Sequence, residues 1–389
     1  MMTSRLPFFA MTSEHVEVTG RCRTSVQPKV GRICLALAIG FFCPCFPAYA
    51  QLPEGSAGLR FGMDIAPDVD RITTRALSYL AKSQLPAGNW DNGFDTHASG
   101  RENSGVTGLA LMAILSTGAD PNSGPYAANI RSAIRYLITE QNPKTGFLPN
   151  TMYNHGFGML ALAEAYGVVD EALLWTDAKP EDDASKRRDL GEALRLAVEC
   201  ALKSQGQNPQ KAWRYGPTSK DADTSVTGAV LVGLLAARNA GVPVPDQNIN
   251  DAMEYIKTLT SRRTGDTGYT MGLGGLTGGS NLSAISTLVM SIGQQSDLEQ
   301  HEAASKRIAK FVDQVDSSFP YYNMYYMAQA LFQSDYESWK RWNEITIRRL
   351  RRQQKDDGSF DSEHGKAYAT SMACLALALN YRFLPIYER

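Results

Sequence analysis

The sequence predicts an all-α protein in which six helix pairs close into a toroid with six inner and six outer helices, an α6–α6 barrel. Two observations carry this prediction. A turn with an aromatic residue, and in all but the copy from Ser317 to Tyr321 a glycine, recurs six times along the chain, and the helices before and after each turn are of two different types. Copies about 40–65 residues apart are the signature of stacked repeats.

The turns come first, because they mark where each pair is joined. The three clear copies are Gln84-Leu-Pro-Ala-Gly-Asn-Trp90, Gln141-Asn-Pro-Lys-Thr-Gly-Phe147 and Gln354-Lys-Asp-Asp-Gly-Ser-Phe360. The three degenerate copies run from Gln205 to Trp213, from Thr264 to Tyr269 and from Ser317 to Tyr321. A glycine in such a turn supplies backbone conformations that other residues rarely adopt.

The helix that precedes each turn is amphipathic. In the first of these helices Val69, Ile72, Ala76 and Leu80 recur at helical spacing, with charged residues on the other face. The same pattern appears around Ile134, and further helices of this type are expected near residues 187–204, 247–260, 301–315 and 337–353. One apolar face and one charged face indicate an outer layer.

The helix that follows each turn is apolar nearly all round and rich in small residues. These helices are expected over residues 105–115, 154–167, 224–235, 281–293, 322–333 and 369–379. A helix that is apolar on every face is buried on every face, so these six form the inner layer.

The first 50 residues read as a leader. Basic residues precede the apolar run from Ile33 to Phe42, and Ala48-Tyr-Ala50 resembles a cleavage site, which is the order of a secretory signal peptide. The protein is therefore expected to be periplasmic or secreted, with a retained N-terminal anchor as the alternative. The expected domains are a signal peptide over residues 1–50, an N-terminal linker over 51–65 and a single toroid over 66–389.

Charge and cysteine content narrow the possible partners. Without the leader the chain has 34 basic and 38 acidic residues, a net charge of −4, which argues against binding nucleic acid or anionic membranes. No later segment is apolar enough to span a membrane.

Cys200 and Cys374 are expected on opposite sides of the ring, too far apart for a disulfide and buried as small apolar residues.

Taken together, the turns and the two helix types resemble the terpenoid cyclase and protein prenyltransferase superfamily, including its squalene-cyclase-like repeat proteins. The resemblance covers residues 66–389. It implies an α6–α6 toroid in which the turn glutamine and aromatic residue brace the step from outer to inner helix.

Within this resemblance, Asp221-Ala-Asp223-Thr224 looks like a shortened Asp-x-Asp-Asp acid motif of the class II cyclases. The likeness implies Asp223 as the general acid and Asp221 as its supporting residue. Thr224 replaces the last aspartate, and the usual second helical domain has no counterpart in this chain. Both departures leave open whether the protein is an enzyme.

The zinc-dependent branch of the superfamily does not match. Its ligand positions are occupied here by Asn281-Leu-Ser283 and Tyr368-Ala-Thr370. No metal and no other cofactor is therefore expected, with a metal held by histidines and aspartates at the mouth as the alternative, and protein prenylation is rejected.

All six inner helices of a toroid begin at one end, which makes that mouth the expected ligand site. The residues expected to bind substrate there are Trp213, Arg214, Tyr153, His155, Tyr322, Tyr325, His364 and Tyr368. Each has a structural alternative. Asp223 suits the N-cap of the helix that follows it, Arg214 can pair with the aspartates, and the tyrosines can serve as core.

Three function classes remain open at this stage. The first is an exported cyclase-like or isomerase-like protein that acts on or binds an isoprenoid, with Asp223 as its acid. The second is a non-catalytic toroid that binds a small molecule or a protein. The third is an exported carbohydrate-active α/α toroid, for which only one carboxylate pair is found.

Overall fold

The computed structural model describes residues 65–91, 103–178, 184–272, 279–314 and 319–387. The expected leader and the expected linker up to residue 64 lie outside the described residues. The assignments of these two segments, and the localisation that depends on them, remain predictions.

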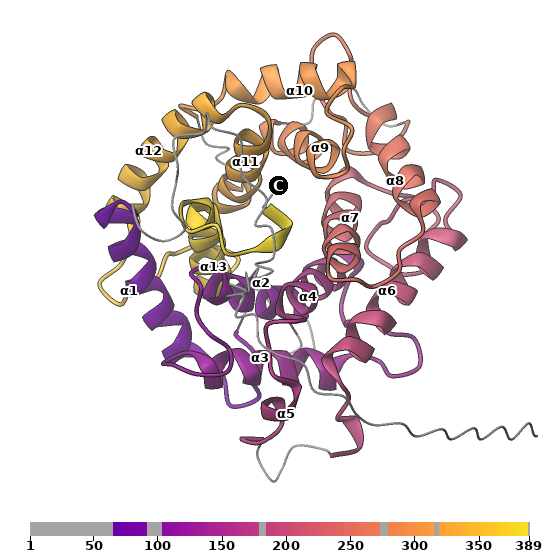
Figure 1. The fold of residues 1–389 in the computed structure, drawn as a ribbon. Coiled ribbons are helices and arrows are strands. Elements are labelled where there is room, and N and C mark those ends of the chain that lie inside the picture. Colours follow the sequence, from indigo (N-terminus) through magenta and orange to yellow (C-terminus); the bar gives the residue numbers. More distant parts are fainter. Residues whose placement is uncertain (1–64, 92–102, 179–183, 273–278, 315–318, 388–389) are drawn as a thin grey trace, which may run out of the picture. The chain divides into compact units, whose positions relative to one another are not determined.

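The described residues form two concentric rings of helices (Figure 1). The inner ring consists of α2 (Ser104–Leu115), α4 (Met152–Ala165), α7 (Thr224–Asn239), α9 (Ser280–Ile292), α11 (Pro320–Ser334) and α13 (Lys366–Leu377). The outer ring consists of α1 (Pro67–Ser83), α3 (Ala127–Glu140), α6 (Leu190–Gln207), α8 (Asp246–Thr258), α10 (Glu299–Ala309) and α12 (Tyr336–Gln353). Each inner helix contacts the next and α13 contacts α2, so the ring closes and the predicted toroid is confirmed.

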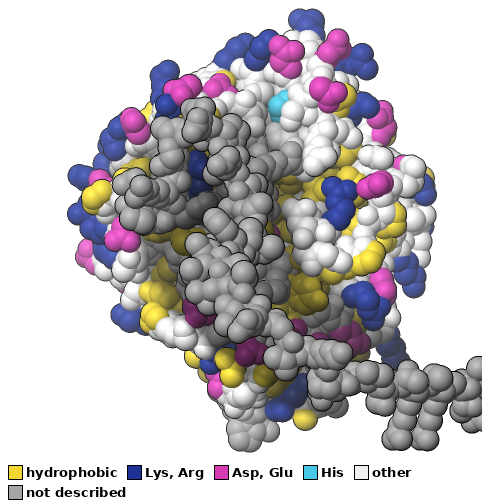
Figure 2. Space-filling view, in the orientation of Figure 1, with side chains coloured by type: hydrophobic (Ala, Val, Ile, Leu, Met, Phe, Trp, Pro, Cys, Tyr) yellow, Lys and Arg dark blue, Asp and Glu magenta, His cyan; other side chains and the backbone are white. Residues whose placement is uncertain are grey.

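The two helix types occupy the predicted layers. Every residue of α2 is buried, whereas α1 buries only one face, which includes Val69, Ile72 and Leu80. In the face drawn in Figure 2, charged side chains gather toward the rim and hydrophobic side chains lie nearer the centre. The apolar pattern of each helix therefore decided its layer.

The turn glutamines tie neighbouring repeats together. In four turns the side-chain Nε2 donates one hydrogen bond to a carbonyl of its own turn and a second to a carbonyl of the next outer helix. Those acceptors are Gly88 and Asn129 for Gln84, Gly146 and Ala193 for Gln141, Lys211 and Asn248 for Gln205, and Gly358 and Ile72 for Gln354, at 2.7–3.0 Å. The bond from Gln354 to Ile72 joins the last repeat to the first.

The turn glycines are needed for two reasons. Gly88, Gly146, Gly265 and Gly358 have φ between 72° and 97°, and a Cβ on any of them would lie 1.9–2.2 Å from a carbonyl oxygen of the next outer helix. In the degenerate copy after Gln205, Lys211 adopts the left-handed conformation instead, with φ 54°. Glutamine bracing thus also occurs at a turn whose left-handed residue is not a glycine.

The end of the chain covers the C-terminal ends of several inner helices. The 3-10 turn η3 (Pro385–Tyr387) contacts α7, and the Ile386 N–H donates to Glu164 Oε1 near the end of α4 at 3.3 Å. The Phe383 ring lies against Gly118, just after α2. This segment occupies the end of the toroid opposite to the first turns of the inner helices.

Smaller features complete the described part of the chain. The four-residue helix α5 (Glu171–Leu174) and the 3-10 turn η1 (Ala184–Lys186) lie in a charged surface excursion between α4 and α6, and η2 (Ala378–Asn380) extends α13. No β-strand occurs in the described residues, and an isolated bridge joins Thr260 to Thr267.

None of the helices in the described part of the chain is long and apolar enough to cross a membrane. Cys200 and Cys374 are buried and unpaired, as predicted.

Candidate functional site

A cavity of about 670 Å³ opens among the first turns of the inner helices. Every inner helix contributes to its wall, either directly or through the residues just before it. The lining residues are Asn103, Gly105, Val106, Leu109, Tyr153, Asn154, Phe157, Tyr215, Ser225, Tyr269, Gly279, Asn281, Leu282, Phe319, Tyr322, His364 and Tyr368. The mouth predicted from the fold is therefore hollow.

The wall is mostly aromatic and aliphatic. Among the described residues, no lysine, arginine, aspartate or glutamate lines the cavity. Four of the expected binding residues lie in this wall: Tyr153, Tyr322, His364 and Tyr368. Their placement agrees with the prediction, although binding itself remains a prediction.

The tyrosines form a packed and uncharged surface. Tyr153 meets Phe157 edge-on with ring centroids 5.0 Å apart, and its ring lies 6.2 Å from that of Tyr322 across the ring of helices. Burial raises the pKa of Tyr153, Tyr322 and Tyr368 well above the usual value for a phenol. These hydroxyls therefore stay neutral at every physiological pH.

Four expected binding residues, Trp213, Arg214, His155 and Tyr325, do not line the cavity, and the prediction that they do is corrected. Trp213 is 1% exposed and its Nε1–H donates to Ala201 O at 2.9 Å. Trp90 makes the same bond to Leu80 O at 2.8 Å, so both tryptophans brace a turn. The indole N–H of Trp213 is occupied inside the fold rather than presented to a ligand.

His155 and Tyr325 support the wall from behind. His155 Nδ1 accepts from the Leu148 N–H at 3.1 Å and Nε2 lies 3.0 Å from Ala197 O, so the neutral ring links α4 to α6. Burial lowers the pKa of His155 to about 4. Tyr325 is 1% exposed and packs edge-on against Phe157, with centroids 6.0 Å apart.

Asp223 is the N-cap of α7. Its Oδ1 accepts from the Val226 N–H at 2.9 Å and from the Ser225 hydroxyl at 2.6 Å. Neutral side chains take the same position in two other repeats, because Asn103 caps α2 and Thr151 caps α4 through the N–H three residues on. The capping interpretation of Asp223 is thereby confirmed.

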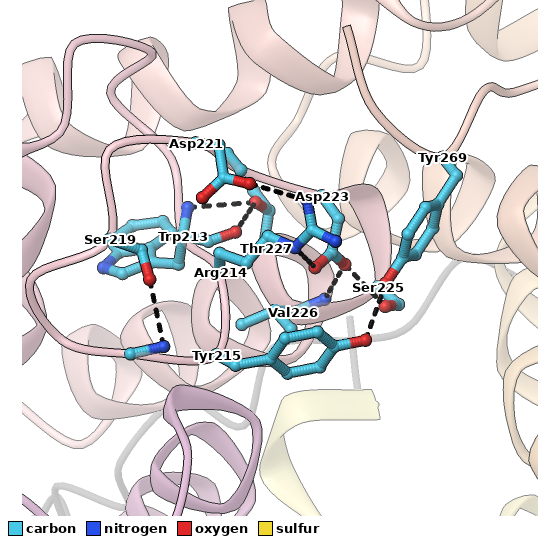
Figure 3. Close-up of polar contacts among 12 residues, drawn as sticks. Trp213, Arg214, Tyr215, Ser219, Asp221, Asp223, Ser225, Val226, Thr227 and Tyr269 are labelled. Carbon is cyan, nitrogen blue, oxygen red and sulfur yellow. Dashed lines mark hydrogen bonds and ion pairs between the residues drawn. The ribbon is translucent and has the colours of Figure 1, made fainter. Parts of the chain in front are cut away.

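Arg214 pairs with both aspartates (Figure 3). Its Nη1 lies 2.8 Å from Asp221 Oδ2 and its Nε lies 3.5 Å from Asp223 Oδ2. The guanidinium carbon lies 5.5 Å from the ring centroid of Tyr215 and 5.6 Å from that of Tyr269. Arg214 and Asp221 are not lining residues, so the structure gives Arg214 a role in holding the two tyrosines and the two acids together.

The carboxyl of Asp223 lies outside the cavity lining and is 0% exposed. Burial raises the pKa of this carboxyl, while the Ser225 hydroxyl, the Val226 N–H and the Arg214 charge act in the opposite direction. Its Oδ2 has no hydrogen-bond partner besides the ion pair with Arg214. Ser225, the second residue of α7, donates to this carboxylate and lines the cavity.

Sequence reasoning missed three wall residues that matter here: Ser225, Tyr215 and Tyr269. The Tyr215 and Tyr269 hydroxyls are 2.7 Å apart, and the loop bearing Tyr269 is held by a bond from the Thr224 N–H to Tyr269 O at 2.9 Å. Tyr269 is the aromatic residue of a degenerate turn, so its position in the repeat was the one available signal. No group of three or more potential metal-ligating acids, histidines or cysteines occurs in the described residues.

No family model and no curated protein matches this sequence. Solved structures do match. The type II terpene cyclase MstE from Scytonema aligns with a TM-score of 0.53 and 15% identity, over 82% of this chain and 100% of that one.

The chain has a terpenoid cyclase-like fold.

Two glycosidases share this architecture. The GH76A α-1,6-mannanase of Salegentibacter sp. HEL1_6 aligns with a TM-score of 0.55 and 10% identity, over 80% of this chain and 98% of that one. The GH76 α-mannanase BT2949 of Bacteroides thetaiotaomicron aligns with a TM-score of 0.52 and 11% identity, over 80% and 95%. At such identities the likeness establishes the toroid, which hosts more than one chemistry.

Proposed function

We propose that this protein binds a largely apolar small molecule of the isoprenoid class in the cavity at the first turns of the inner helices. The observation that carries the proposal is the wall itself, in which aromatic and aliphatic side chains surround about 670 Å³ and none of the described lining residues is acidic or strongly basic. Ligand pockets of about 300–1,000 Å³ with an apolar lining and few polar groups bind drug-sized molecules.

The cyclase neighbour supports this ligand class. A variant of MstE was solved with geranylgeranyl dihydroxybenzoate, a molecule with a long isoprenoid chain. A toroid of this architecture therefore accommodates such a chain. The aromatic faces of Tyr153, Phe157 and Tyr322 suit the double bonds of an isoprenoid, since stacked and edge-on contacts add to simple burial.

A sugar substrate is less well supported. Glycoside hydrolysis usually needs two carboxyl groups facing each other across the substrate, roughly 5–9.5 Å apart. None of the lining residues that the structure describes carries a carboxylate, and Asp221 and Asp223 both pair with Arg214 on one side of the cavity. The mannanase neighbours therefore supply a shared fold and no matching pair of acids in this wall.

Acid catalysis by Asp223 is the second candidate. Burial raises the pKa of its carboxyl, which favours the protonated form that a general acid needs, and its Oδ2 makes no hydrogen bond. Its position outside the cavity lining and its capping bonds favour a structural role instead. The two candidates share the same ligand class and differ only in whether the ligand is transformed.

The experiment is a binding titration of the protein with geranylgeraniol by intrinsic fluorescence, with mass spectrometry of the bound and product lipids. A Leu282→Trp variant narrows the cavity, because Leu282 is part of its wall. We expect at least about tenfold weaker binding, since excluding two or three methylenes removes roughly 0.8 kcal/mol each. Leu85→Trp, in an exposed turn, is the matched control and should bind as the unaltered protein does.

The same experiment separates binding from catalysis. If the lipid is converted and Asp223→Asn stays folded but loses conversion, Asp223 acts as an acid. If the lipid is bound unchanged, the protein is a binding toroid. Absence of binding, or equal binding by both leucine variants, would contradict the proposed function.

A further inference from the structure

Ser225 differs from the other polar groups of the cavity wall because its hydroxyl hydrogen is already used. The hydroxyl donates to Asp223 Oδ1 at 2.6 Å. The same oxygen accepts from the Val226 N–H at 2.9 Å, so Oδ1 acts as an acceptor. A carboxyl proton would sit on Oδ2, which makes no hydrogen bond, and Ser225 is therefore the donor in either charge state of Asp223.

This arrangement leaves Ser225 Oγ with only lone pairs to offer the cavity. The carboxylate that holds the hydroxyl is 0% exposed and is fixed at the start of α7 by its capping bond. Figure 3 shows Ser225 beside Asp223, and Tyr215 and Tyr269, whose hydroxyls are 2.7 Å apart, line the same cavity. A ligand group at this point must donate a hydrogen bond to Ser225.

The charges behind the wall disfavour an anionic group when both acids are ionised. Arg214 is paired with both Asp221 and Asp223, so two negative charges face one positive charge when both acids are ionised. An incoming phosphate would meet a net negative cluster whose guanidinium is already engaged.

We propose that Ser225 is the acceptor for a hydroxyl group at the polar end of the ligand, so that the protein selects an isoprenoid alcohol over the corresponding ether or diphosphate. This inference rests on the proposed function, because it names the head group of the same apolar ligand. The isoprenoid chain then lies along the aromatic wall formed by Tyr153, Phe157 and Tyr322.

The test compares three probes on the full chain: geranylgeraniol, its methyl ether and geranylgeranyl diphosphate. The alcohol should bind about three- to tenfold more tightly than the ether, the range of one neutral hydrogen bond, and the diphosphate should bind more weakly than the alcohol. In Ser225→Ala the alcohol should fall to the affinity of the ether, while the affinity for the ether stays unchanged.

Two further variants make the result specific. Ser219→Ala removes a hydroxyl that accepts from the Gly216 N–H outside the wall, and it should leave the alcohol preference intact. Asp223→Asn keeps an oxygen that can accept from Ser225, and the preference should survive there too. A preference that persists in Ser225→Ala, or a diphosphate that binds more tightly than the alcohol, overturns the inference alone. Failure of all three probes to bind overturns the proposed function as well.

Discussion

Replacing Gly358 by alanine should destabilise the protein at the seam where the ring closes. Gly358 lies in the turn between α12 and α13 with φ 90°, and a Cβ there would lie 2.2 Å from Arg75 O and 2.7 Å from Arg75 C, both in the backbone of α1. The same turn is tied to α1 by the bond from Gln354 Nε2 to Ile72 O at 2.8 Å. Neither backbone can move without loosening that bond.

The expected loss has two parts. The left-handed conformation costs a residue with a Cβ about 1–2 kcal/mol. Overpacking against a backbone that cannot yield adds about 1–3 kcal/mol. The free energy of unfolding of Gly358→Ala should therefore fall by about 2–5 kcal/mol.

Gly124 offers a matched control. Its φ is 89°, and a Cβ there would meet nothing within 4 Å. Gly124→Ala should lose only the conformational part, about 1–2 kcal/mol. The difference between the two variants isolates the close approach of the turn to α1.

Urea-induced unfolding followed by far-UV circular dichroism measures both variants at equal protein concentration. The midpoint of Gly358→Ala should lie clearly below that of Gly124→Ala, with similar slopes. Equal losses in the two variants would refute the argument, because the contact with α1 would then add nothing to the conformational cost.

Three further outcomes follow from buried titratable groups. Burial lowers the pKa of His155 to about 4, so the unfolded chain binds more protons than the folded one between pH 6.5 and 4. The free energy of unfolding should therefore fall by roughly 3 kcal/mol as the pH drops through that window. His155→Gln, which can make both hydrogen bonds of His155, should flatten this pH dependence in urea unfolding. Burial raises the pKa of Glu164 to about 8, although the hydrogen bond from the Ile386 N–H lowers it, so the folded state holds a proton that the unfolded state releases. The free energy of unfolding should decline from pH 4.5 to 8. Glu164→Gln should be more stable than the unaltered protein at pH 8, and a lower melting temperature of the variant at that pH would contradict this. Burial raises the thiol pKa of Cys200 to about 11 and that of Cys374 to about 12. Neither thiol should react with a thiol reagent at pH 8 until denaturant is added. Rapid labelling of the native protein would contradict this expectation.

Much of the site could be predicted, and the exceptions have a common cause. Tyr153 and His155 were both expected in the mouth, yet they are two residues apart on α4 and about 200° apart around it. Tyr153 therefore faces the cavity while His155 points to α6. The side of α4 that faces the cavity is set by packing against the neighbouring helices, and the sequence pattern alone does not predict it.

The sequence by itself determined the toroid, because helix periodicity and the turn residues are local properties that recur from repeat to repeat. Burial all round or on one face assigns each helix to its layer whatever its neighbours are. The tertiary structure alone decided that Asp223 is enclosed behind Ser225 and paired with Arg214, and that Tyr269 comes to the wall from another repeat. Those relations depend on contacts between loops of different repeats, and residue spacing along the chain does not predict such contacts.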